Sequence, residues 1–210
     1  MNMEAPDQPV EQHSSTEDTT ASRLLLEAQL RECFGRVVYS HKTHEKCADI
    51  LLSQWRLIKI SQMVLAAGTT AGFVATVCGA GITASVVGAL VSTALLTLNA
   101  YTKDYDHGQL AQKHKQTAAG LWLIREKYLS LLVDLAMGER PIEGLQKQRD
   151  DLMHDLHSVY SGAPATTSKA YLKAQEALQS KEDLTFSEEE IDVFLPKELK
   201  RTRSKLPNSG

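Results

Sequence analysis

The most distinctive pattern along the chain is an uncharged apolar window. Residues 60–102 contain no Asp, Glu, Lys, Arg or His, so all 49 Asp, Glu, Lys and Arg residues (23 plus 26) lie outside them. A helix that crosses a hydrocarbon core roughly 30 Å thick needs about 20 residues, so the window holds two spans. Gly79 and Gly81 at its midpoint permit a tight reversal, which disfavours the alternative of one long buried helix. The predicted spans cover residues 60–77 and 82–101, with the turn at residues 79–81.

Apolar positions continue on both sides of this window at alternating spacings of three and four. The first seam consists of Leu30, Phe34, Val37, His41, His44, Ala48, Leu51, Trp55 and Ile58. The second consists of Leu110, His114, Thr117, Leu121, Ile124, Tyr128, Leu131 and Leu135. This is heptad spacing, and two seams that leave one hairpin should pair in antiparallel fashion. The expected fold class is all-α: a two-helix transmembrane hairpin continuous with a cytoplasmic antiparallel coiled coil, plus C-terminal helices.

Composition and turn residues divide the rest of the chain. The acidic start is rich in Ser, Thr, Gln and Pro, which is typical of disorder, and it lacks the apolar region of a signal peptide. Ser187 and Glu190 have the spacing of a capping box. The predicted segments are a disordered acidic N-terminus (1–21), a cytoplasmic helix (22–59), the transmembrane hairpin (60–102), cytoplasmic helices (103–160), and a linker with short helices and a basic tail (161–210).

Basic residues flank the window and are missing from its turn. They are Lys42, Lys46, Arg56 and Lys59 before it, and Lys103, Lys113 and Lys115 after it. The positive-inside rule therefore predicts that both termini face the cytoplasm. Trp55, Tyr101 and Tyr105 fall at the ends of the spans, where aromatic rings serve either headgroup contact or helix packing.

The two spans are rich in small and polar residues. Gly68 and Gly72 form a GxxxG pair, and Ala84 and Gly88 are also four apart, so helix backbones can approach closely. Polar residues recur every seven positions, at Gln62, Thr69 and Thr76 and then at Ser85, Ser92 and Asn99. Seven residues is nearly two turns, so each series forms one stripe. These stripes either line a pore in an oligomer, or bond to nearby carbonyls and across the hairpin.

A possible ligand cluster lies in the two seams. Reflection about the turn places position i level with about 160 minus i, so His114 falls beside His44 and Cys47, with His41 one turn away. Imidazoles and a thiolate are competent metal ligands, and histidines can titrate near neutral pH. Polar seam residues more often fix helix register, and no carboxylate supports the cluster, so no metal is expected. Three widely spaced cysteines, Cys33, Cys47 and Cys78, indicate reduced thiols.

Several functional classes find no support in the residues. There is no phosphate-binding glycine loop, HExxH, CxxC or GxSxG motif, so we expect neither an enzyme nor a cofactor. A net charge of −3 gives no reason to expect direct nucleic-acid binding.

Particular segments resemble a known family. They are RVVYSHKTH at 36–44, NAY at 99–101, LIREKY at 123–128, LLVD at 131–134 and LPKEL at 195–199. Together with the hairpin they resemble the bacterial SLATT family of two-span effectors over residues 22–199. The resemblance implies a multi-pass protein of the bacterial inner membrane, encoded near a nucleotidyltransferase, a nucleotide sensor or a reverse transcriptase. No ligand-binding residue can be transferred from it.

The sequence thus predicts a membrane effector of a bacterial antiphage conflict system. In this hypothesis the chain forms a homo-oligomer in the lipid bilayer and, when triggered through its cytoplasmic helices, opens a pore that depolarises the membrane. The alternative is a membrane tether or scaffold for a cytoplasmic partner, which would tolerate changes in the polar stripes. A weaker third possibility is an enzyme, which would require His44, Cys47 and His114 to converge on an open coordination position.

Overall fold

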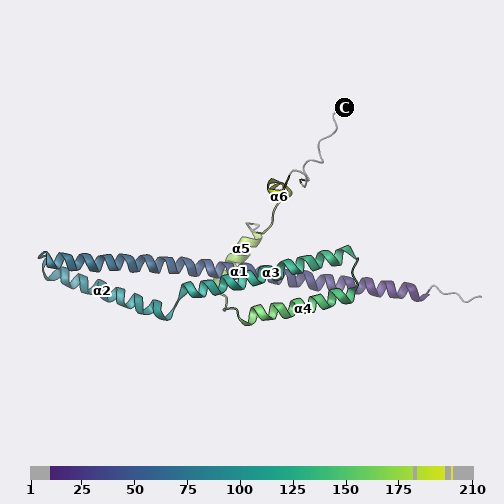
Figure 1. Ribbon diagram of the computed structural model, residues 1–210, viewed down its shortest axis with the longest axis horizontal. Coiled ribbons are helices and arrows are strands. Elements are labelled where there is room, and N and C mark those ends of the chain that lie inside the picture. Colours follow the sequence, from purple (N-terminus) through teal and green to yellow (C-terminus); the bar gives the residue numbers. More distant parts are fainter. Residues whose placement is uncertain (1–9, 182–183, 197–199, 201–210) are drawn as a thin grey trace, which may run out of the picture.

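The computed structural model describes residues 10–181, 184–196 and 200, and among these it contains six α-helices and no strand (Figure 1). The helices are α1 (Val10–Val77), α2 (Gly81–Asp104), α3 (His107–Met137), α4 (Ile142–Ser161), α5 (Ser168–Gln179) and α6 (Glu188–Phe194). The all-α prediction is confirmed. The molecule is a long rod of antiparallel helices from which α5 and α6 leave at a steep angle.

Helix α1 is the central helix of the whole molecule. Its 68 residues would extend about 100 Å, and it runs without a break from the helical bundle to the hairpin turn. It begins at Val10, inside the segment 1–21 for which the sequence predicts disorder. Extending a helix that is already packed needs no new nucleation, which explains why an acidic polar segment can continue it.

The chain reverses immediately after α1. Gly79 and Gly81 both have positive φ, 90° and 75°, which a side chain would strain. The amides of Cys78 and Ala80 donate to the carbonyls of Val74 and Ala75, both at 3.0 Å, and close the last turn of α1. The reversal therefore lies at the two predicted glycines.

The return path is interrupted between α2 and α3. Tyr105 and Asp106 are not helical, and the Asp106 side chain accepts a hydrogen bond from the amide of Gln109 at 2.9 Å. Asp106 is therefore the N-cap of a new helix. The second helix of the hairpin, expected to run nearly unbroken into the coiled coil, is interrupted at these two residues.

On the side of the break away from the hairpin, α1, α3 and α4 form a three-helix bundle. Its core consists of Leu26, Leu30, Val37, Leu121, Ile124, Tyr128, Leu131, Leu135, Leu145 and Leu152. Every member of the second predicted seam except Leu110 is buried. Helix α4 packs closely, because a Cβ on Gly120 would lie only 3.2 Å from Val159. Sequence reasoning found α4 but not its place as the third helix.

Two further helices complete the described chain. Helix α5 crosses α1 through three buried alanines, Ala170, Ala174 and Ala177, whose small side chains allow close approach. Helix α6 carries the predicted capping box: the Ser187 hydroxyl accepts from the amide of Glu190, and the Glu190 carboxylate accepts from the amide of Ser187. The predicted basic tail lies outside the described residues beyond Lys200.

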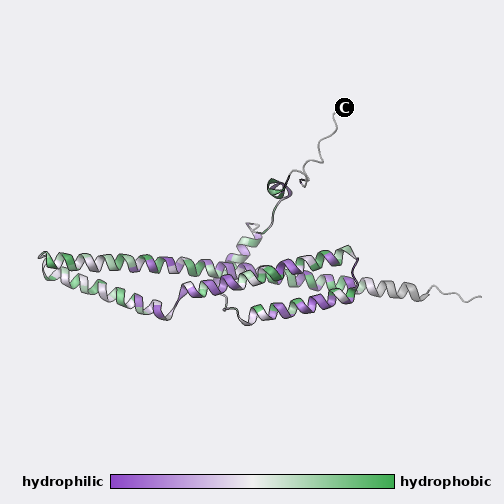
Figure 2. Cartoon of the chain, viewed as in Figure 1, coloured by the Kyte–Doolittle hydropathy of each residue, from purple (hydrophilic) through white to green (hydrophobic). Residues whose placement is uncertain are grey.

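Hydropathy separates the rod into two parts. The hairpin end is apolar and the bundle is mixed (Figure 2). The segments Thr19–Val77 and Gly81–Met137 each contain an 18-residue stretch apolar enough to cross a membrane, and neither stretch is buried in the fold. An unburied apolar stretch of this length is not the core helix of a soluble domain, and it matches the thickness of a bilayer.

Candidate functional site in the membrane hairpin

Two glycines bring α1 and α2 into backbone contact. A Cβ on Gly72 would lie 3.2 Å from the Cα of Gly88 and 3.8 Å from the carbonyl oxygen of Ala84. Gly68 has more room, since its Cβ would meet only a methyl group of Val91 at 3.5 Å. The closest approach in the hairpin is therefore at Gly72 and Gly88.

The two polar stripes meet each other at both ends of the hairpin. Near the bundle, the Gln62 amide donates to the Asn99 carbonyl oxygen at 2.8 Å. Near the turn, the hydroxyls of Thr76 and Ser85 are 3.3 Å apart. Between these ends, Thr69 donates to the Leu65 carbonyl four residues back, at 2.9 Å. Ser92 is exposed on α2. Both bonding modes expected for non-pore stripes are thus present in the single chain.

A shallow groove of about 290 Å³ gathers several of these residues on one face of the hairpin. It is lined by Thr69, Gly72, Phe73, Thr76, Ala84, Ser85, Gly88 and Ala89. Three of these belong to the predicted stripes and three to the predicted packing positions. Small side chains let another helix approach closely, and hydroxyls offer it hydrogen bonds. Elsewhere the hairpin presents large apolar side chains, with Val77 72% and Ile82 79% exposed.

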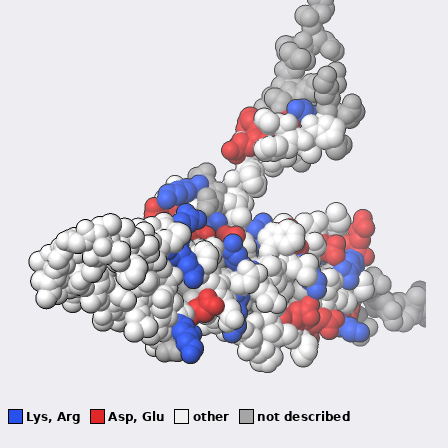
Figure 3. Space-filling model, turned by 60° about the vertical axis from the view of Figure 1, so that its left-hand side comes forward, with Lys and Arg blue, Asp and Glu red and all other residues white. Residues whose placement is uncertain are grey.

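The base of the hairpin is marked by charges and aromatic rings. Figure 3 shows the hairpin as a surface without Lys, Arg, Asp or Glu, and Lys and Arg appear where the bundle begins. The rings of Tyr101 and Tyr105 stack with centroids 5.2 Å apart. The Lys59 ammonium lies 5.9 Å from the centre of the Trp55 ring, close enough for a cation–π contact. All three aromatic rings are at least two-fifths exposed, so they can pack on neighbours and still reach headgroups.

A pair of buried histidines joins α1 to α3 in the bundle. The Nδ1 atoms of His44 and His114 are 2.9 Å apart, as the reflection about the turn predicts. One Nδ1 must donate and the other accept, so the accepting ring is neutral. Burial lowers the pKa of His44 to about 4, with repulsion from His114 and His41 adding to the effect. Burial also lowers the pKa of His114.

The other members of the predicted cluster do not join this pair. His41 turns to Glu45, with 3.7 Å between Nε2 and the nearer carboxylate oxygen, and burial lowers its pKa. Cys47 is a buried free thiol. Over the described part of the chain no three His, Cys, Asp or Glu side chains are arranged to hold a metal ion. The observed pair instead fixes the register of two helices.

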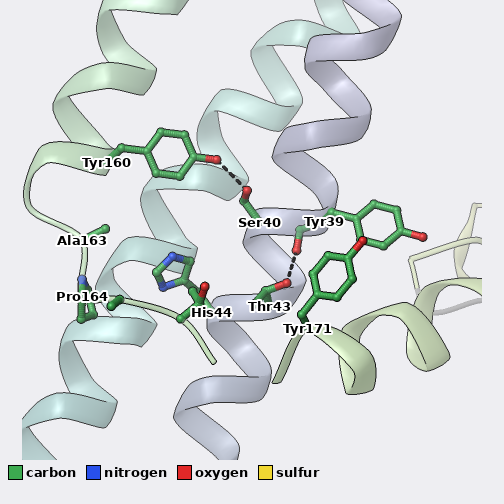
Figure 4. Close-up of a pocket in the computed structure, with 10 residues that line it drawn as sticks. Tyr39, Ser40, Thr43, His44, Tyr160, Ala163, Pro164 and Tyr171 are labelled. Carbon is green, nitrogen blue, oxygen red and sulfur yellow. Dashed lines mark hydrogen bonds between the residues drawn. The ribbon is translucent and has the colours of Figure 1, made fainter. Parts of the chain in front are cut away.

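Sequence reasoning missed a hollow of about 330 Å³ beside His44 (Figure 4). Helix α1 supplies one wall, the end of α4 and residues 163–166 supply another, and Tyr171 of α5 closes it. The Tyr160 hydroxyl donates to the Ser40 hydroxyl at 2.6 Å across it. Only a tertiary fold that returns α4 and α5 to the middle of α1 creates this hollow, so no local pattern signals it.

Comparison with known proteins gives one family. The family model described as "SMODS and SLOG-associating 2TM effector domain family 4" matches residues 26–190. That range includes the bundle, the hairpin and α5. No curated protein and no solved structure matches the chain.

Proposed function

Because the chain belongs to the SMODS and SLOG-associating 2TM effector domain family, we propose that it is a membrane effector of a bacterial conflict system that acts by forming a pore. Hairpins of several copies assemble in the inner membrane, and the assembly depolarises the cell. The hairpin groove is the observation that supports assembly, since it combines close-packing glycines with hydroxyl groups.

The hydrogen bonds within the hairpin are compatible with a pore lining. A threonine hydroxyl that donates its proton to a carbonyl four residues back keeps lone pairs that can accept from water. Thr69 and Thr76 both donate in this way. A modest rotation of α1 against α2 in an oligomer would replace the bonds at Gln62 and Ser85 with bonds to water. Because the window has no charged residue, we expect the pore to select only weakly between ions.

The continuous α1 suggests how a signal reaches the membrane. One rigid helix connects the histidine pair in the bundle to the hairpin turn, so a tilt imposed on the bundle moves the hairpin. The break at Tyr105 and Asp106 lets α2 move relative to α3. The family name points to nucleotide-generating or nucleotide-sensing proteins as the source of the signal. We propose no catalytic role for the chain itself.

Membrane potential in cells expressing the protein with its activator tests this function. Thr69→Leu should dry the proposed lining and lower depolarisation, measured with a voltage-sensitive dye. Thr70→Leu is the matched control, because Thr70 is an exposed neighbour that also donates to a carbonyl four residues back, at 3.1 Å. Equal depolarisation in both variants would reject the pore lining. Absence of depolarisation in the activated natural protein would favour a tether.

A further inference from the structure

The C-terminal arm, residues 184–195, is acidic, amphipathic and separate from the bundle (Figure 1). It has four acidic residues, Glu188, Glu189, Glu190 and Asp192, and no Lys or Arg. Figure 3 shows Asp and Glu residues gathered on this arm. Asp192 is buried, whereas Glu188, Glu189 and Glu190 are exposed. Phe186 and Phe194 are 63% and 80% exposed. A seven-residue helix is too short to be stable by itself, so a surface that covers these rings would stabilise it.

A complementary surface lies on the bundle between α1 and α3. This Trp122 groove is a hollow of about 640 Å³ lined by His41, Lys42, Glu45, Lys46, Asp49, Lys115, Ala118, Ala119 and Trp122. Its lysines outnumber its carboxylates, three to two. The Trp122 side chain is 50% exposed and provides an apolar wall.

Arg125 adds to the positive charge beside this groove. It lies two helical turns after Ala118, on the same face of α3. Its Nε and Nη1 atoms are buried and have no acceptor among the described residues, while Nη2 lies 3.2 Å from a Glu126 carboxylate oxygen. The guanidinium acts on His41 of the groove through its charge, so it adds positive potential there while its buried nitrogen atoms stay inside the bundle.

Because every copy inserts its hairpin in the same membrane, the bundles of neighbouring copies stand at the same distance from it. Neighbouring rods stand parallel, so equal levels of two copies face each other. The arm leaves its bundle at the level of Tyr39 and Lys46: Gln179 donates to the Tyr39 hydroxyl at 2.8 Å, and Lys181 lines a hollow with Lys46. The Trp122 groove lies at this same level, because Lys46 also lines it.

We propose that the acidic arm of one copy docks in the Trp122 groove of the adjacent copy. The contact joins two different surfaces, so its repetition closes into a ring when the rotation between copies permits. The exposed Glu189 carboxylate of α6 pairs with the exposed Lys115, and Phe194 packs on Trp122. This inference rests on the proposed function, because it identifies the contact that assembles the oligomer.

Cross-linking between two tagged forms of the full chain tests the contact. Both forms carry Cys33→Ala, Cys47→Ala and Cys78→Ser; one adds Val193→Cys in the arm and the other adds Ala119→Cys in the groove. A short bismaleimide applied to membranes should join the two tags. Lys115→Glu should lower the yield about tenfold, and Glu189→Lys in the arm should restore it. Lys147→Glu on the exposed face of α4 is the matched control and should change nothing.

The outcomes separate the arm from the proposed function. Failure of the two tags to become joined overturns the docking of the arm on a neighbour. In that case, copies that still cross-link through Ala89→Cys in the hairpin groove and still depolarise cells leave the pore intact. Copies that fail to associate by either route and do not depolarise cells reject the pore as well.

Discussion

The two glycines of the GxxxG pair are not equivalent. Gly72→Ala and Gly68→Ala raise helix propensity by similar amounts. A difference in stability between the two variants therefore reports the packing at each position. Gly72→Ala places a methyl group 3.2 Å from the Gly88 backbone, whereas Gly68→Ala makes ordinary contact with Val91. We expect Gly72→Ala to cost about 1–3 kcal/mol more, measured as the midpoint of thermal unfolding in detergent. Equal midpoints for the two variants would contradict the close approach.

The histidine pair makes stability depend on pH. Unfolded His44 takes up a proton near pH 6.5, but the folded protein resists protonation until about pH 4. The neutral His44 side chain therefore makes its full contribution to the free energy of unfolding above pH 6.5. This contribution is lost as the pH falls toward 4, and in total it amounts to roughly 3 kcal/mol. In the double variant His44→Leu with His114→Leu, the midpoint of thermal unfolding should depend less on pH over this range. His157→Leu, at an exposed position on α4, is the control and should keep the natural acid dependence.

Residue pairing across the molecule was largely predictable because helices have a constant rise. The residue numbers of paired positions sum to 161 for Gln62 with Asn99 and to 158 for His44 with His114. The small drift follows from the break at Tyr105, since extended residues cover more distance than helical ones. Periodicity placed His44 beside His114. It could not show that His41 turns to Glu45, because that depends on the side-chain neighbours of each ring.

At the scale of helices, the α2–α3 break makes a specific prediction about Asp106. Asp106→Ala removes the acceptor for the Gln109 amide and should cost about 1 kcal/mol in the first turn of α3. Hydrogen–deuterium exchange of peptides covering residues 105–112 should then be faster. Asp106→Asn keeps a capping oxygen and is the control. Equal exchange rates in the Ala variant and the natural protein would show that the Asp106 cap does not stabilise the first turn of α3.

The break and the packing of α4 and α5 were harder to read from the sequence than the long helices. Asp106 and Gly108 were available as cap signals, but the apolar spacing on both sides favoured one continuous helix. The alanine face of α5 has weak hydrophobicity, and its burial depends on α1 passing beneath it. Local patterns identify such helices, whereas their partners are decided by tertiary packing.

At the scale of the whole molecule, the rod has one apolar end that contains a natural reporter. Cys78 is exposed at the hairpin turn, while Cys33 and Cys47 lie partly or fully buried in the bundle. The positive-inside rule predicts that the turn faces the periplasm. A membrane-impermeant maleimide should therefore label intact spheroplasts at Cys78, and Cys78→Ser should abolish the labelling. In disrupted membranes the maleimide reaches Cys78 whichever side the turn faces, so this labelling controls for the reactivity of the thiol. Labelling of Cys78 only after disruption would place the turn in the cytoplasm and reverse the orientation, in which case Lys and Arg at the base of the hairpin would have been carried across the membrane.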